Sequence, residues 1–251
     1  MSNKIMCLPR IFAVFSALIL SGFLGTASAA PLVIDSFSAC SQSLSVPTAG
    51  ATVSSTAAGC GASVLGGTRQ IDLAYTNGGG LPITADVFLF GTLPGLFYAE
   101  DSSIDGVVTL TYSGVGFDLT SGGVGNHDKF VFDFRNSDIN LVYGVTVVGG
   151  GTSTYNSGVI APILTPTILN ANFSSFSLGA DFTAVTSLVF SFDSSGVIGN
   201  DFVINSITTD GHTPVAAPEP GSLMLLGIGA IGLVGFRFLR RKEDAIIGFS
   251  V

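Results

Sequence analysis

The sequence has few positive charges. Of its 251 residues nine are Lys or Arg. The stretch 30–217 holds three of them, Arg69, Lys129 and Arg135, against 14 Asp and Glu, a net charge of −11. Nucleic acids and anionic lipid surfaces are bound through cationic patches. This stretch is therefore not expected to bind nucleic acid, whereas its charge is compatible with neutral glycans or divalent cations.

Residue types that carry chemistry are also scarce. The only histidines, His127 and His212, lie in polar contexts without the spacing of metal ligands, which predicts exposed loop residues rather than zinc ligands. No G-x-S-x-G elbow occurs. Glycosidases pair two carboxylates, but the lone Glu of the stretch, Glu100, stands among 13 Asp with no distinguishing spacing. The sequence thus predicts no catalytic residues and no zinc site.

Tryptophan, a favoured stacking platform for sugars, is absent altogether. Tyrosines could substitute for it at a carbohydrate-binding surface. The sequence has five of them: Tyr75, Tyr98, Tyr112, Tyr143 and Tyr155.

The N-terminus has the three parts of a secretory signal peptide. Lys4 and Arg10 precede an apolar run, 11–20, and Ala27-Ser28-Ala29 supplies small residues at the positions that a signal peptidase requires. We expect residues 1–29 to direct the chain into the general secretion machinery and to be removed after Ala29.

Three cysteines are present, and Cys7 leaves with the signal peptide. Cys40 and Cys60 remain as an even pair in an oxidising compartment, which predicts a disulfide closing the N-terminal part, 30–62. The enclosed residues 41–59 are mostly small, so the disulfide is expected to order them. The alternative, a catalytic cysteine, has no His nearby in the sequence.

Alternating hydrophobic residues indicate β-strands throughout the middle of the chain. Ile71, Leu73 and Tyr75 share one face of a strand at 69–75, and Asn77-Gly-Gly-Gly80 marks a turn. Phe130, Phe132 and Phe134 share one face of a strand at 129–135. Further strands are expected at 83–90, 106–112, 141–148, 173–178, 185–192 and 202–207.

No amphipathic helix is evident between these runs, which are separated by clusters of Gly, Ser, Asn and Asp. We therefore expect an all-β fold, a single β-sandwich or jelly-roll-like exported domain over residues 30–217. Its alternating phenylalanines are expected to form the core.

One segment begins like a calcium loop. Asp101, Ser103 and Asp105 place oxygen donors at positions 1, 3 and 5, and Gly106 stands at position 6. Position 12 is Tyr112, where such a loop needs a carboxylate. Calcium is a candidate ligand here, and the alternative is a polar β-turn held by Asx-type hydrogen bonds. No other cofactor is expected.

The C-terminal region contains an apolar segment that is long enough to cross a membrane. Residues 221–239 would form about 28 Å of helix, close to the thickness of the hydrocarbon core. Four cations lie at this end of the segment: Arg237 is inside it, and Arg240, Arg241 and Lys242 follow it. By the positive-inside rule we expect residues 243–251 to be a cytoplasmic tail and the body of the protein to lie outside.

Just before this segment, Pro218 and Pro220 flank Glu219 and prevent the helix from continuing backwards. An extended Pro-Glu-Pro peptide, an apolar helix and an Arg-rich end, in this order over 218–242, resemble the PEP-CTERM protein-sorting signal. This resemblance implies recognition and removal of the tail by an exosortase, a membrane-embedded cysteine transpeptidase of bacteria that make extracellular polysaccharide. The residues Glu243–Val251 depart from the family pattern, in which the chain usually stops soon after the basic cluster.

Signal peptide, sandwich and sorting tail together predict an exported cell-surface or extracellular-matrix protein, with a structural or interaction role in a polysaccharide-rich envelope. The alternatives are a carbohydrate-binding module for extracellular polysaccharide and, third, a glycan-active enzyme. The expected partners are an exosortase-type transpeptidase, signal peptidase and the secretion machinery, the membrane and a polysaccharide.

Overall fold

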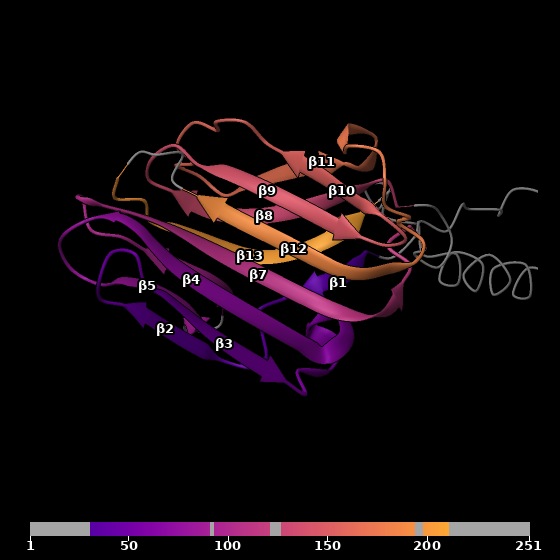
Figure 1. Cartoon of the computed structure of the whole chain (residues 1–251), viewed down its shortest axis with the longest axis horizontal. Coiled ribbons are helices and arrows are strands. Elements are labelled where there is room, and N and C mark those ends of the chain that lie inside the picture. The colour runs from indigo at the N-terminus through magenta and orange to yellow at the C-terminus, as the bar shows by residue number, and fades with distance from the viewer. Residues whose placement is uncertain (1–30, 91–92, 121–126, 194–197, 211–251) are drawn as a thin grey trace, which may run out of the picture. The chain divides into compact units, whose positions relative to one another are not determined.

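The computed structural model describes residues 31–90, 93–120, 127–193 and 198–210, which form a sandwich of two antiparallel sheets (Figure 1). The first sheet has seven strands. In spatial order they are β11 (Thr167–Asn172), β8 (Lys129–Ser137), β13 (Phe202–Asp210), β6 (Leu93–Ala99), β5 (Ile83–Phe90) and β2 (Gln42–Val46), and β1 (Leu32–Asp35) pairs with β13 outside this order.

The second sheet has six strands and faces the viewer in Figure 1. In spatial order they are β10 (Thr152–Asn156), β9 (Val142–Val148), β12 (Val185–Asp193), β7 (Ile104–Phe117), β4 (Thr68–Gly78) and β3 (Thr52–Ala58). Three single-turn 3₁₀ helices complete the described elements: η1 (Gly61–Ser63), η2 (Leu65–Gly67) and η3 (Phe173–Ser175).

The core lies between the sheets and is built by the alternation of side chains along each strand. On β8, Phe130, Phe132 and Phe134 are fully buried, as their spacing predicts. Phe132 meets Phe190 and Phe192 of the opposite sheet edge to face, with ring centroids 5.5 and 6.2 Å apart. Such aromatic pairs add about 0.5–1.5 kcal/mol each beyond the burial of their area. The predicted all-β sandwich is confirmed.

The strand predicted at 173–178 is wrong. Phe173 begins η3 and Phe176 follows it, so the two rings are three residues apart, which is one turn of a 3₁₀ helix. Both rings pack on Phe130, with centroids 5.0 and 5.8 Å away. The edge strand lies just before them, at β11.

No helix in the described part of the chain is long and apolar enough to cross a membrane. The predicted signal peptide at 1–29, the sorting signal at 218–242 with its span at 221–239, and the tail at 243–251 all lie outside the described residues.

Candidate functional site

A buried ion pair lies beside the disulfide at one edge of the sandwich. Arg69 of β4 and Asp35 at the end of β1 are both fully buried, and Arg69 Nη1 lies 2.8 Å from Asp35 Oδ2. Arg69 Nε donates to Gln42 Oε1 at 2.8 Å. Tyr112 Oη of β7 donates to Asp35 Oδ2, also at 2.8 Å. The cluster therefore joins both sheets.

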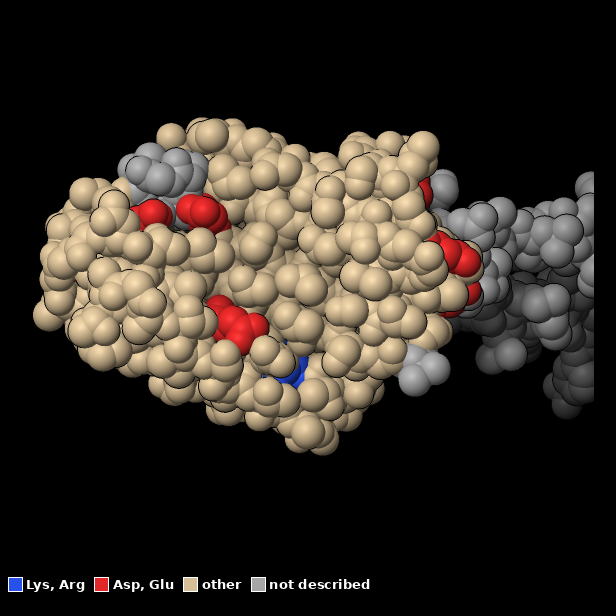
Figure 2. All heavy atoms as spheres, in the orientation of Figure 1, with Lys and Arg blue, Asp and Glu red and all other residues tan. Residues whose placement is uncertain are grey.

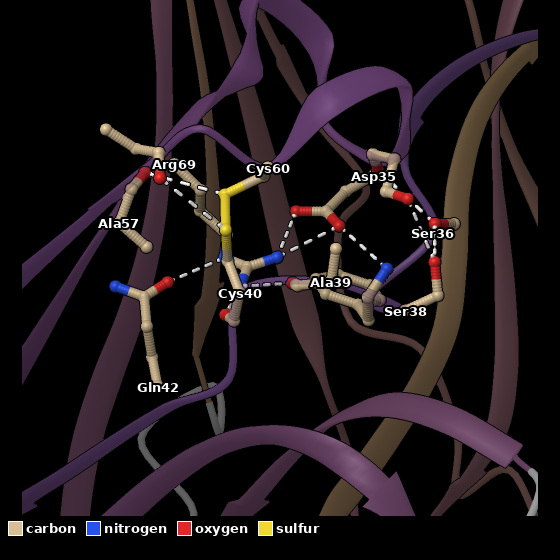
Figure 3. The surroundings of a disulfide bond; sticks show 12 residues. Asp35, Ser36, Ser38, Ala39, Cys40, Gln42, Ala57, Cys60 and Arg69 are labelled. Carbon is tan, nitrogen blue, oxygen red and sulfur yellow. Dashed lines mark hydrogen bonds and ion pairs between the residues drawn. A yellow bond between two sulfur atoms is a disulfide. The ribbon is translucent and has the colours of Figure 1, made fainter.

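The same cluster fixes the backbone before the disulfide. Arg69 Nη2 donates to the carbonyl oxygen of Cys40 at 2.6 Å, and the amide of Phe37 donates to Asp35 Oδ1 at 2.7 Å. Phe37 and Cys40 both have positive φ, 51° and 58°, a conformation that is unfavourable for residues with a Cβ. Figure 3 shows the guanidinium beside the Cys40–Cys60 bond, between Asp35 and Gln42. Buried hydrogen bonds thus hold two strained residues in place.

Burial raises the pKa of Asp35, against the lowering effects of the Arg69 charge and of its hydrogen bonds. It also raises the pKa of Tyr112 well above its ordinary value, with the Asp35 charge adding to the effect. All three guanidinium nitrogens donate to atoms of the protein. The cluster is therefore saturated by internal partners, which suits a structural role rather than chemistry on a ligand.

The predicted disulfide is confirmed. Cys40 and Cys60 are bonded, with their Cα atoms 5.4 Å apart. The residues between them are not an irregular loop, because they contain β2 and β3. The Gln42 side chain reaches from β2 to the carbonyl oxygen of Ser55 on β3 at 3.0 Å, so the enclosed strands are also tied to each other.

A second buried carboxyl group, that of Glu100, lies between β6 and β7. It is 8% exposed. Tyr98 Oη donates to its Oε1, and the amide of Asn200 donates to its Oε2 at 3.0 Å. Burial raises the pKa of Glu100 to about 7, although these hydrogen bonds lower it. A carboxyl group of this pKa could act as a general acid or base, but here both oxygens are engaged within the protein.

The raised pKa makes stability depend on pH. Between pH 4.5 and about 7 folded Glu100 holds a proton that the unfolded chain releases, so the free energy of unfolding falls as pH rises through this window, by about 1–3 kcal/mol. We expect Glu100→Gln to remove the Glu100 contribution to that fall, since Gln can accept from Asn200 and donate to Tyr98. Urea unfolding at pH 5 and pH 8 measures the change in the free energy of unfolding. The control is Asp72→Asn, which replaces a carboxyl group on the outer face of the sandwich. A wild-type pH dependence retained in Glu100→Gln would refute this assignment.

The calcium candidates are engaged in local hydrogen bonds. Asp101 Oδ1 accepts from the Ser102 amide at 2.7 Å, Ser103 Oγ donates to the Gly79 carbonyl at 2.7 Å, and Asp105 accepts from Thr76. Gly78 approaches this turn so closely that an added Cβ would lie 2.0 Å from Ser103 O. Within the described residues no three His, Cys, Asp or Glu side chains form a group able to hold a metal. A calcium role for Asp101, Ser103 and Asp105 stays a prediction.

The prediction that His127 is an exposed loop residue is wrong. His127 is 2% exposed, and its Nδ1 lies 2.6 Å from Thr209 Oγ1 of β13. Its polar neighbours in the sequence gave no sign of this, because the burial comes from strand β13, 82 residues away. His212 lies outside the described residues.

The tyrosines are not available for sugar stacking. Four of them, Tyr75, Tyr98, Tyr112 and Tyr143, are at most 2% exposed, and Tyr155 is half-buried against Tyr143. Each buried tyrosine falls on the inward register of its strand, so its ring belongs to the core.

Comparison with protein families gives a match near the C-terminus. The model of the PEP-CTERM protein-sorting motif matches residues 216–242. The chain carries a PEP-CTERM sorting signal. The match spans the Pro-Glu-Pro peptide, the apolar segment and the basic residues at 237–242. No curated protein matches the chain.

Among solved structures, the family 11 carbohydrate-binding module of the cellulosomal cellulase Lic26A-Cel5E of Clostridium thermocellum is similar, with a TM-score of 0.38 and 16% identity over 74% of this chain and 97% of that one. An exo-beta-agarase has a TM-score of 0.36 and 14% identity over 57% of this chain and 23% of its own. A TM-score below 0.5 does not establish a common fold, so the assignment of the sandwich rests on strand order and register.

The PEP-CTERM signal and the sandwich differ in charge. Four of the nine basic residues lie at 237–242, whereas the sandwich is acidic. Figure 2 views the second sheet, where acidic atoms appear in a few separate places and basic atoms are almost absent. The individual roles of Pro218, Glu219 and Pro220, and of the four orientation cations, stay predictions.

Proposed function

We propose that this chain is an exported, non-enzymatic protein of the cell surface or extracellular matrix. It is held in the membrane by its C-terminal segment until an exosortase-type transpeptidase acts on the sorting signal. The observation that carries this proposal is the PEP-CTERM motif at 216–242. In this proposal signal peptidase cleaves after Ala29, and the cations at 237–242 keep the end of the chain in the cytoplasm.

One feature of the sandwich supports export, and another supports a role without catalysis. A disulfide between Cys40 and Cys60 is stable in oxidising compartments and rare in the cytosol. The two buried carboxyl groups, Asp35 and Glu100, accept hydrogen bonds from within the fold, as expected for a protein that acts through its surface.

Glu219→Ala is expected to abolish processing without affecting membrane insertion. Glu219 lies in the extended peptide that a transpeptidase would read, and the apolar segment 221–239 is unchanged. In cells that make an exosortase, fractionation with an epitope placed after residue 30 should show wild-type protein released and the variant retained at full length in the membrane.

Glu243→Ala, the same change beyond the motif, is the matched control and should be released as the wild type is. Equal release of Glu219→Ala and the wild type would contradict exosortase processing. Full-length Glu219→Ala found outside the membrane fraction would contradict the anchor.

A further inference from the structure

The outer face of the first sheet carries two stacked aromatic rings. Val87 on β5 and Leu96 on β6 point into the core and are at most 1% exposed. Phe88 and Phe97 take the alternate positions and therefore point outward. Phe88 is 37% exposed and Phe97 is half-buried, and their rings stack with centroids 4.5 Å apart and planes 20° apart. The alternation that buries Phe130, Phe132 and Phe134 on β8 here exposes a pair of rings.

A glycine, Gly95, leaves room for the Phe97 ring of this pair. Gly95 pairs with Phe88 across the strands, and a Cβ at Gly95 would lie 3.1 Å from Phe97 Cε2 and 3.3 Å from Val203 Cγ1. The Phe97 ring therefore lies over the glycine, a known way for an aromatic residue to cover a strand glycine. That role accounts for Phe97 but not for the exposure of Phe88.

Polar groups continue this face across the sheet. Asn205 on β13 donates from Nδ2 to Asp133 Oδ2 of β8 at 3.3 Å, while Asn205 Oδ1 is buried and accepts no hydrogen bond. On β5, Asp86 is the cross-strand partner of Phe97 and so lies next to the rings on the same outer face. The five neighbouring strands β5, β6, β13, β8 and β11 together span about 19 Å at the usual spacing of strands. The face thus combines an apolar platform with a line of hydrogen-bonding groups.

The outer face of the second sheet, seen in Figure 2, has a different character. Its outward residues are small and mostly hydroxyl-bearing, as in the row Thr146, Val189, Thr111, Gln70 and Thr56. Among the described outward positions of its strands no aromatic residue occurs. The rings therefore distinguish the first sheet as the face that can stack on a ligand.

Charge limits the ligand. Of the three basic residues of the sandwich, Arg69 is fully buried in its pair with Asp35, and Lys129 and Arg135 take outward positions of β8 on this same face. The stretch 30–217 nevertheless has a net charge of −11, and a net negative charge repels polyanions at long range. A sugar ring without acidic groups has an apolar face that stacks on aromatic rings and hydroxyls that pair with carboxylates and amides.

We propose that the outer face of the first sheet, around Phe88 and Phe97, binds a polysaccharide that carries no acidic groups. This inference rests on the proposed function, because an exported protein meets such a polymer outside the cell. The exposed face of the Phe88 ring holds the apolar face of a sugar unit, and Asp86 and Asp133 accept hydrogen bonds from the sugar hydroxyls.

The full chain, purified in mild detergent, tests this by affinity electrophoresis in gels containing mixed-linkage β-glucan, galactomannan or dextran, with alginate as the acidic polymer. We expect saturable retardation by at least one neutral polymer and none by alginate. Phe88→Ala with Phe97→Ala should raise the apparent Kd about tenfold or more. Leu178→Ala, which removes a fully exposed side chain elsewhere, should bind as the wild type does.

Phe88→Ala alone keeps the test sound if the double variant unfolds, because Phe88 is the more exposed ring; it should still weaken binding about threefold. The proposal is overturned if no neutral polymer retards the chain, if alginate alone does, or if folded Phe88→Ala binds as the wild type does. Glu219→Ala should bind normally, so failure of the sorting proposal and failure of this one give different results.

Discussion

Replacing Asp35 with Asn is expected to lower the free energy of unfolding by about 3–5 kcal/mol, because removing one member of a buried ion pair leaves the other charge uncompensated. Arg69 is fully buried, and its Nη1 donates to both Asp35 oxygens, at 3.0 and 2.8 Å. Asn preserves the shape of the side chain but removes its charge. The amide hydrogens of Asn would also face the guanidinium, which can only donate.

Urea unfolding of the full chain measures this loss. Asp72→Asn is the matched control, because Asp72 lies on the outer face of β4, the strand that carries Arg69, and accepts from Ser54 and Gln70 near solvent. Changes of this kind at the surface usually stay within about 0.5 kcal/mol. If Asp35→Asn were as mild as the control, the buried pair would not hold the N-terminal part of the sandwich.

Much of the fold follows from alternation alone. Strand β5 lies at the residues expected, and β4, β7, β8, β9, β12 and β13 differ from expectation mainly at their ends. These strands have one buried face each, so the period of two is strong. Strand β3 consists mostly of Ser, Thr and Ala, β2 is short and begins with Gln42 at a buried position, and β6 contains Pro94 and Gly95. They were missed because hydrogen bonding to their neighbours, rather than their own composition, makes them strands.

The buried cluster was also missed, although one signal was present. Arg69 continues the alternation of Ile71, Leu73 and Tyr75 into a core position, where an arginine needs a buried acidic partner. The partner, Asp35, is 34 residues earlier, and one sequence cannot show which of many carboxylates pairs with it. The same long-range packing buries His127 against Thr209.

Replacing Cys40 and Cys60 with Ser is expected to cost about 3 kcal/mol for a closed loop of this length. The sequence separation is 20 residues. The effect should exceed the entropy of the loop alone, because Arg69 Nη2 donates to the carbonyl of Cys40, whose φ is positive. Without the disulfide that carbonyl is less well held, and the guanidinium loses a well-placed acceptor.

Because Arg69 contacts both Asp35 and the carbonyl of Cys40, we expect the two substitutions to be coupled. Asp35→Asn and the double serine variant should not add independently, because both loosen the same partners of Arg69, and coupling of about 0.5–3 kcal/mol is usual for residues in one network. Urea unfolding of the wild type, each variant and their combination, in oxidising buffer, completes the cycle. Asp72→Asn combined with the serine variant should be additive. Strict additivity of both combinations would show that the disulfide and the ion pair stabilise the sandwich separately.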